Sequence, residues 1–195
     1  MALKGSSKIP NLSFQEKRGV KKIITACENC SITLKEFCEG IEVIPIYKIL
    51  ANNLPKEAIG KYSNSDNIVN IHDPYPSRYD DELQESIREI LISLGFTIEA
   101  LDYSKNKTIC CSSGGMVSQT SPEISQRHMK RRSSEGDKPM VTYCKECVNR
   151  LGNQREIDHI INLIFDDKEK AFTSYRPYSS VNSWMNRYKA KSINK

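Results

Sequence analysis

The sequence lacks the features that mark several common classes of protein. It has no uninterrupted apolar run near the ~20 residues that a bilayer span requires, and hydrophobic residues are 38% and charged residues 27% of the 195. Its first residues, MALKGSSKIPNLSFQEKRGV, have neither the apolar stretch nor the small-residue cleavage site of a secretory signal. We therefore expect a cytoplasmic protein without a transmembrane segment.

Common catalytic and ligand-binding motifs are also missing. The sequence contains no Walker loop, GxGxxG fingerprint, HExxH helix or serine nucleophile elbow, so phosphate, dinucleotide and hydrolase chemistry have no support. The net charge of +5 comes from the first 22 residues and the residues after Ser174, and the body between them has no excess of basic residues. We expect no nucleic-acid partner, and we interpret His128 with Lys130, Arg131 and Arg132 as a solvated helix face rather than a docking site for a polyanion.

Strand and helix patterns alternate along the chain. Strands are expected at 20–26, 41–50, 67–72, 96–102 and 139–143, and helices at 31–40, 79–95 and 121–136. The strand at 41–50 is expected to turn into a short helix toward 50–60. The clearest helix is 79–95, which has an apolar face formed by Leu83, Ile87, Ile90, Leu91 and Leu94. The alternation predicts an α/β fold with a largely parallel sheet flanked by helices, in which sites form at the carboxyl ends of strands.

Seven cysteines in a cytoplasmic chain indicate metal or redox chemistry rather than disulfides. A single CxxC is compatible with a redox dithiol, a metal half-site or chance, but this chain has two, CENC and CKEC. The segment IITACENCSITL at 23–34 aligns with MVTYCKECVNRL at 140–151, so the chain contains one and a half copies of a unit. Cys38 falls on an apolar helix face and is expected in the core.

The stretch TICCSSGG places Cys110 and Cys111 side by side. Neighbouring side chains in an extended segment point to opposite sides, so both thiols reach one centre only if the backbone turns sharply. Gly114 and Gly115 permit such a turn.

CCSSGG, VTYCKEC and the upstream NIHDPYPSR resemble the cysteine-rich CCG domain of iron–sulfur oxidoreductases. This family includes iron–sulfur components of heterodisulfide reductase and of anaerobic glycerol-3-phosphate dehydrogenase. The resemblance covers about residues 20–170. It implies that Cys110, Cys111, Cys144 and Cys147 hold a 4Fe-4S cluster, with other oxidoreductase subunits as electron donor and acceptor. Zinc is the alternative metal.

The chain departs from the family pattern at three places. Tyr75 stands where the family has its leading cysteine, and Ser112 stands where it has a glycine after Cys-Cys. No Cys-Cys pair precedes CENC, so the chain resembles a member that lacks its N-terminal half. Cys27 and Cys30 are then a relic, a redox dithiol, or half of a second metal site that another polypeptide completes.

The expected organisation is a polar leader at 1–19, a cysteine-rich domain at 20–170 and a basic, aromatic-containing tail at 171–195. Within the domain, 20–60 is the remnant of a first copy and 65–170 is a second copy.

His72, Ser112, Gly114 and Gly115 are expected to surround the cluster and hydrogen-bond to it, although His72 also fits a residue that only anchors a loop by hydrogen bonds. We expect an iron–sulfur redox subunit that serves electron transfer or thiol/disulfide reduction within an oxidoreductase complex; the alternative is a non-catalytic scaffold with structural zinc or an empty cysteine site.

Overall fold

The structure is a computed structural model that describes residues 19–63 and 67–173, together with residues 181, 184, 185 and 188. The expected leader and most of the expected tail therefore lie outside the described residues. In the described part, strands and helices alternate as the sequence predicts.

Four parallel strands form the central sheet. They are β3 (Ile68–His72), β4 (Thr97–Glu99), β5 (Met140–Thr142) and β6 (Ile157–His159), in the spatial order β4-β3-β5-β6. All three pairings are parallel, and His72 at the end of β3 is the register partner of Thr142 at the end of β5. The predicted α/β class with a parallel sheet is confirmed.

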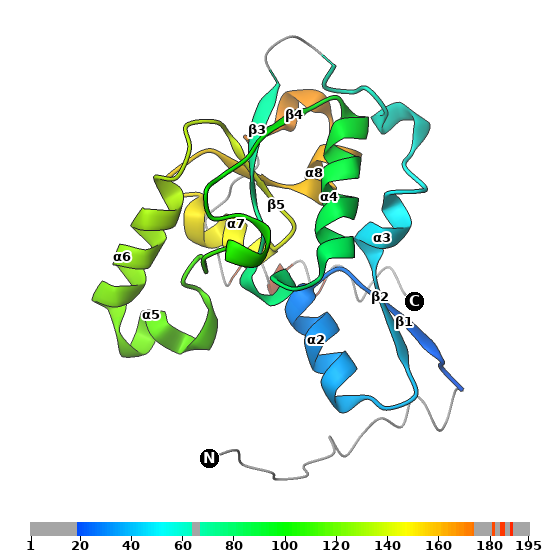
Figure 1. Cartoon of the computed structure of the whole chain (residues 1–195), viewed down its shortest axis with the longest axis horizontal. Helices are drawn as coiled ribbons and strands as arrows, with labels where there is room; N and C mark the ends of the chain where they lie inside the picture. The colour runs from blue at the N-terminus through cyan, green and yellow to red at the C-terminus, as the bar shows by residue number, and fades with distance from the viewer. Residues whose placement is uncertain (1–18, 64–66, 174–180, 182–183, 186–187, 189–195) are drawn as a thin grey trace.

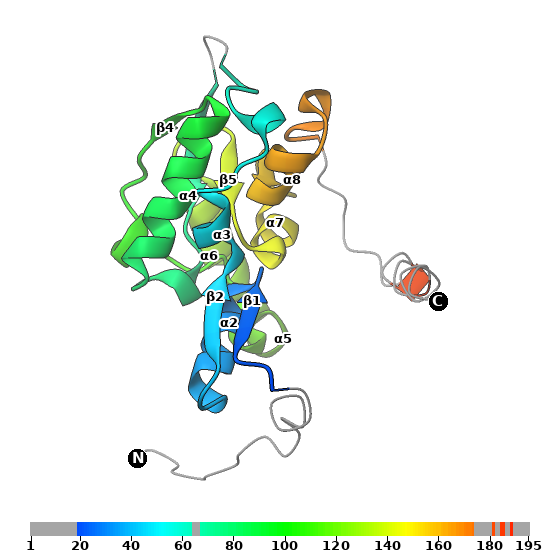
Figure 2. The same ribbon diagram turned by 90° about the vertical axis from the view of Figure 1, so that its right-hand side faces the viewer.

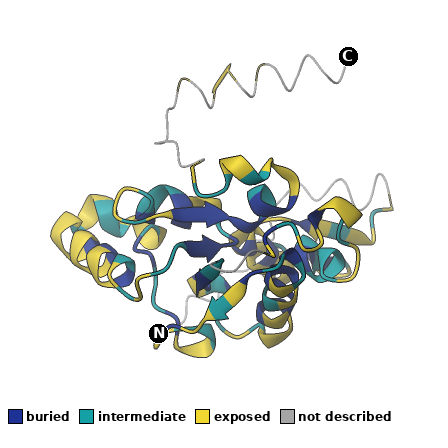
Figure 3. Ribbon diagram, turned by 90° about the horizontal axis from the view of Figure 1, so that it is seen from above, coloured by how far each residue is buried: buried dark blue, intermediate teal, exposed yellow. Residues whose placement is uncertain are grey.

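Helices cover both faces of this sheet. Side chains of α3 (Ile46–Leu50), α4 (Asp81–Leu94) and α8 (Ile160–Phe165) pack with those of β3 and β5 in the larger core cluster. On the other face, α6 (Pro122–Ser133) and α7 (Lys145–Leu151) contribute to a second cluster. Figure 1 shows α6 and α7 on one side of β5 and α4 and α8 on the other, and Figure 2 shows α4 alongside the sheet. Strands β3, β5 and β6 are buried, whereas the edge strand β4 is partly exposed. The outer helix surfaces are exposed (Figure 3).

Helix α4 forms as its sequence predicts. The Asp80 side chain accepts a hydrogen bond from the backbone N–H of Leu83 and so caps the first turn. Gly95 ends the helix in the left-handed conformation, with φ of 97°. The five apolar residues expected on one face are all fully buried.

A smaller unit stands apart from the central sheet. Strands β1 (Lys22–Thr25) and β2 (Glu42–Pro45) form a two-stranded parallel sheet joined by α2 (Glu28–Phe37), at the lower edge of Figure 1. The order β1, α2, β2, α3 matches the order β5, α7, β6, α8. Cys27 and Cys144 also take nearly the same backbone conformation, with φ, ψ of −138°, 119° and −129°, 114°. The two segments that align in sequence thus have the same local structure.

Three expected boundaries are wrong. Helix α2 begins at Glu28 rather than Ser31, so Cys30 lies in its first turn. The strand expected at 41–50 is limited to β2, and α3 follows it directly. The strand expected at 96–102 ends at Glu99, and the chain reaches Cys110 through an irregular segment.

The remaining helical elements are α5 (Val117–Thr120) and the short 3₁₀ turns η1 (Lys56–Ala58), η2 (Tyr75–Ser77), η3 (Lys105–Lys107), η4 (Gly114–Met116) and η5 (Lys168–Lys170). No helix in the described part of the chain is long and apolar enough to cross a bilayer.

Candidate metal centre

The alternation of side chains along β3 and β5 decides which residues face the cysteines. Ile71, Val141 and Tyr143 point into the larger core cluster, so His72 and Thr142 point to the opposite face. This face, which α6 and α7 cover, also carries buried Cys111 and Cys147. We call it the cysteine face.

The structure brings the four predicted ligands together on the cysteine face. Cys144 is the N-cap residue of α7 and Cys147 lies in its first turn, while Cys110 and Cys111 arrive from the loop before η4. The sulfurs of Cys111 and Cys147 are 3.2 Å apart, and Cys144 packs against the same cluster. Cys111 and Cys147 are buried, whereas Cys110 and Cys144 are partly exposed, so the centre lies just below the surface.

The thiols influence one another's pKa. Hydrogen bonds with Cys110 and Cys147 lower the pKa of Cys111, and a hydrogen bond with Cys147 lowers that of Cys144. The pKa of Cys110 is raised by its hydrogen bond with Cys111 and by burial; that of Cys147 is raised by hydrogen bonds with Cys111 and Cys144 and by burial. Four thiolates this close together would repel one another, so a bound cation that neutralises their charge favours deprotonation of all four.

The turn after Cys111 differs from the expectation. Ser112, Gly115 and Met116 have left-handed backbone conformations, with φ of 70°, 65° and 55°, whereas Gly114 does not. The backbone N–H of Ser112 donates to the Cys110 sulfur at 3.2 Å. The Ser112 side chain donates to the hydroxyl of Ser125 on α6 at 3.0 Å. Ser112 thus contacts the Cys110 sulfur through its backbone and α6 through its side chain.

His72 is completely buried beside these thiols. One of its ring nitrogens lies within 4.8 Å of the sulfurs of Cys111 and Cys147, and these three residues could together hold a metal ion. Its Nδ1 accepts a hydrogen bond of 2.8 Å from Nε of Arg132. Its Nε2 is buried without a hydrogen-bond partner in the described part of the chain. Burial lowers the pKa of His72, which keeps the ring neutral.

Asp73, the next residue, anchors the loop that carries the cysteine pair. Its carboxylate is completely buried and accepts two hydrogen bonds from Arg88, at 3.1 and 2.9 Å, and one from the backbone N–H of Lys105 at 2.8 Å. Its carbonyl oxygen accepts from the Thr108 hydroxyl at 2.6 Å. The segment before Cys110 is therefore tied to the end of β3.

Cys27 and Cys30 lie outside this centre, and both are exposed. A hydrogen bond with Cys27 raises the pKa of Cys30, so the two thiols are close together. The Tyr47 hydroxyl donates to the carbonyl oxygens of Ala26, at 3.4 Å, and Tyr143, at 3.2 Å. These carbonyls immediately precede Cys27 and Cys144, so one tyrosine holds the two CxxC turns near each other.

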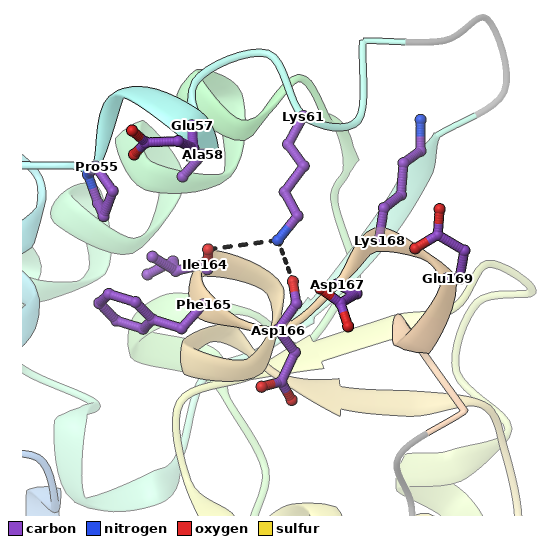
Figure 4. A pocket seen from close by; sticks show the side chains of 10 residues that line it. All are labelled: Pro55, Glu57, Ala58, Lys61, Ile164, Phe165, Asp166, Asp167, Lys168 and Glu169. Atoms are coloured by element: carbon purple, nitrogen blue, oxygen red, sulfur yellow. Dashed lines mark hydrogen bonds between the residues drawn. The ribbon is translucent and has the colours of Figure 1, made fainter.

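A hollow elsewhere on the surface holds no cysteine. It lies between η1, the end of α8 and η5 (Figure 4). The Lys61 ammonium donates to the carbonyl oxygens of Leu163, Ile164 and Asp166 at the C-terminal end of α8. This cation is engaged in capping the helix, and the hollow offers no chemistry related to the cysteine centre.

Several residues of the site were not found from the sequence. Arg132 was expected on a solvated face but is completely buried; its spacing from buried Ser125 and Met129 on the same helix is the signal that could have revealed it. Tyr47 offered no signal beyond its place in an apolar segment. Tyr75 is half exposed under the guanidinium of Arg78, so it lies at the surface.

The comparison with protein families agrees with the geometry. Residues 72–152 match the family model described as "CCG: Cysteine-rich domain". The matched segment runs from His72 past Cys147 and so includes the whole cysteine centre. No curated protein matches the chain.

The donor set fits a metal or cluster. Four thiols converge from two segments, and thiolates are the ligands that zinc and iron–sulfur clusters share. His72 lies beside these thiols, and its buried Nε2 has no hydrogen-bond partner among the described residues. The cysteine face is therefore a candidate metal- or cluster-binding centre.

Proposed function

We propose that Cys110, Cys111, Cys144 and Cys147 hold an iron–sulfur cluster of the 4Fe-4S type and that the protein is a redox subunit of a larger oxidoreductase. The observation that carries the proposal is the convergence of two cysteine pairs on the cysteine face, within the segment that matches the CCG family. Such a cluster supplies one-electron transfer when it is bound.

The surroundings support a redox role. Hydrogen bonds to cluster sulfurs adjust reduction potential, and the backbone N–H of Ser112 already donates to Cys110. Cys110 and Cys144 are partly exposed, so the outer side of the centre is accessible to a partner that delivers or removes an electron. We propose a cytoplasmic complex in which other subunits are the donor and the acceptor.

Cys27 and Cys30 provide a second place for a partner. They are exposed, and Tyr47 holds their turn close to that of Cys144. We propose that Cys27 and Cys30 form half of a second metal site and that another polypeptide supplies the missing thiols.

A structural zinc site is the second candidate, and one distance favours it. Zinc–sulfur bonds of about 2.3 Å in a tetrahedron put the sulfurs about 3.8 Å apart, near the 3.2 Å between Cys111 and Cys147. A scaffold protein with one zinc ion would therefore need little rearrangement of these two thiols.

Cysteine variants test which thiols hold the group. Cys111→Ser should abolish bound iron, or zinc, in protein purified without oxygen, because it removes a buried ligand at the centre. Cys38→Ala removes a buried thiol elsewhere and should leave the metal content unchanged. Equal metal content in Cys111→Ser and the parent chain would show that this centre does not hold the metal.

A further inference from the structure

Arg132 is a fully buried cation held in a fixed orientation. Its Nη1 donates to the carbonyl oxygen of Tyr103 at 2.7 Å and to the Glu135 carboxylate, and Nη2 donates to the carbonyl oxygen of Ile71 at 3.4 Å. The remaining donor, Nε, points at Nδ1 of His72 at 2.8 Å. With the rest of the guanidinium fixed by three acceptors, the direction of this last hydrogen bond is fixed as well.

This hydrogen bond determines the tautomer of His72. A guanidinium nitrogen is always a donor and cannot accept, so Nδ1 must offer a lone pair and cannot carry a proton. The charged ring, which has protons on both nitrogens, is excluded for the same reason. The neutral ring then carries its single proton on Nε2.

Nε2 is the nitrogen left for the cysteines. Nδ1 is engaged by Arg132, while Nε2 is buried and has no partner in the part of the chain that the structure describes. A ring nitrogen of His72 lies within 4.8 Å of the sulfurs of both Cys111 and Cys147. An N–H group at this place requires an acceptor, and these sulfurs are close enough to supply one.

The same arrangement argues against His72 as a metal ligand. A histidine that binds a metal through one nitrogen carries its proton on the other, which it donates to a carboxylate, carbonyl or water. Here the other nitrogen accepts from a cation. Coordination through Nε2 would move the proton to Nδ1, where it would face the N–H of Arg132 at 2.8 Å.

We propose that Arg132 is a positioning residue, which holds His72 as a hydrogen-bond donor to the sulfurs of Cys111 and Cys147 and excludes it from the metal ligands. The ligands that the protein supplies are then sulfur alone. The claim that only sulfur ligands hold the bound metal or cluster rests on the proposed function. The claim about the tautomer of His72 does not.

The tautomer can be measured directly by ¹⁵N NMR of the histidine side chains in the full chain. There are only three histidines, and a His72→Asn variant identifies the signals of His72. We expect a bare Nδ1 and a protonated Nε2, both in metal-free protein and after loading with cadmium-113. A proton on Nδ1, or on both nitrogens, would overturn the proposal.

Cadmium-113 also reports the ligands. We expect a chemical shift typical of four sulfur ligands and no coupling to an imidazole nitrogen; coupling to Nε2 of His72 would contradict the proposal. If cadmium does not bind at all, the four thiols do not act together as ligands of a single ion, and the tautomer in the metal-free protein still decides the role of Arg132.

Arg132→Lys tests the positioning role, with Arg155→Lys as a matched control. Lysine keeps the charge but has no Nε–H in this place, so His72 should populate the Nδ1–H tautomer, and cadmium affinity should fall by about 10–100-fold. Arg155 is also partly buried and donates to the carbonyl oxygens of Glu135 and Lys138, without contact to His72. Its variant should leave the tautomer unchanged. An unchanged tautomer in Arg132→Lys would refute the positioning role, and if that variant does not fold, the tautomer in the parent chain decides.

Discussion

At the scale of single residues, the molecule buries several groups that prefer water, and the buried charges of Asp73 and Arg132 have partners. Asp73 is completely buried but faces Arg88, and Arg132 is completely buried but donates to Tyr103, Glu135 and His72. Glu28 differs from them, because its Oε1 is buried without a partner among the described residues.

Glu28 should make the stability of the protein depend on pH. Burial, with the negative charge of Asp80, raises its pKa from 4.5 to about 7. The folded state thus holds the proton more tightly than the unfolded state, so this contribution to stability is full below pH 4.5 and is lost as the pH rises through about 7. Glu28→Gln stays neutral and should be more stable than the parent by about 1–3 kcal/mol at pH 8, but not at pH 4.

Urea unfolding at both pH values measures this difference. Glu36→Gln, on the exposed side of the same helix, is the control and should keep the pH dependence of the parent. An equal loss of stability between pH 4 and pH 8 in Glu28→Gln and the parent would rule out Glu28 as the cause.

At the scale of elements, the turn after the cysteine pair combines backbone strain with a hydrogen bond. Ser112 has a φ of 70°, which is unfavourable for a residue with a Cβ atom by about 1–2 kcal/mol, and its hydroxyl bonds to Ser125. Ser112→Ala loses the hydrogen bond and keeps the strain, whereas Ser112→Gly loses both. We expect the glycine variant to be more stable than the alanine variant by about 1 kcal/mol in denaturant unfolding; the opposite order would show that the turn does not have this conformation.

Helix α4 supplies much of the larger core. Leu91 is completely buried, whereas its neighbour Ile92 is 63% exposed. Leu91→Ala should therefore lower the free energy of unfolding by about 2–5 kcal/mol, and Ile92→Ala by less than about 0.5 kcal/mol. Similar losses in thermal or urea unfolding for both variants would mean that the helix packs through a different face.

The success of sequence prediction also varied by element. The bounds and buried face of α4 followed from local signals, which are apolar spacing, an aspartate cap and a terminal glycine. The path from β4 to Cys110 did not, because that segment is held by hydrogen bonds from Lys105 and Thr108 to Asp73, more than 30 residues earlier. Arg132 was misplaced for the same reason, since its partners Ile71, His72 and Tyr103 are distant in sequence and the charged run around it is typical of a solvated helix.

At the scale of the whole molecule, two sets of thiols differ in access. Cys27 and Cys30 are exposed on the unit formed by β1, α2 and β2, whereas Cys38, Cys111 and Cys147 are buried. The described part of the chain gives Cys27 and Cys30 no Cys-Cys pair of the kind that Cys144 and Cys147 have. The molecule therefore presents one assembled cysteine centre and one accessible pair of thiols.

The rate of alkylation should distinguish the exposed thiols of Cys27 and Cys30 from the buried thiols. Iodoacetamide should label Cys27 and Cys30 in the folded protein well before the buried cysteines, as followed by mass spectrometry of peptides. A Cys27→Ser/Cys30→Ser double variant should lose this early labelling and keep the metal content of the assembled centre. Loss of the metal in the double variant would place the metal at the exposed pair instead.

The central claim is that Cys110, Cys111, Cys144 and Cys147 hold an iron–sulfur cluster. The most direct measurement is the iron, sulfide and zinc content of protein purified without oxygen, with its visible absorption and its EPR spectrum before and after reduction. We predict about four irons and four sulfides per chain, with an EPR signal that changes on reduction. Zinc alone, or no metal at all under conditions that preserve iron–sulfur clusters, would contradict the claim and leave a scaffold protein as the better account.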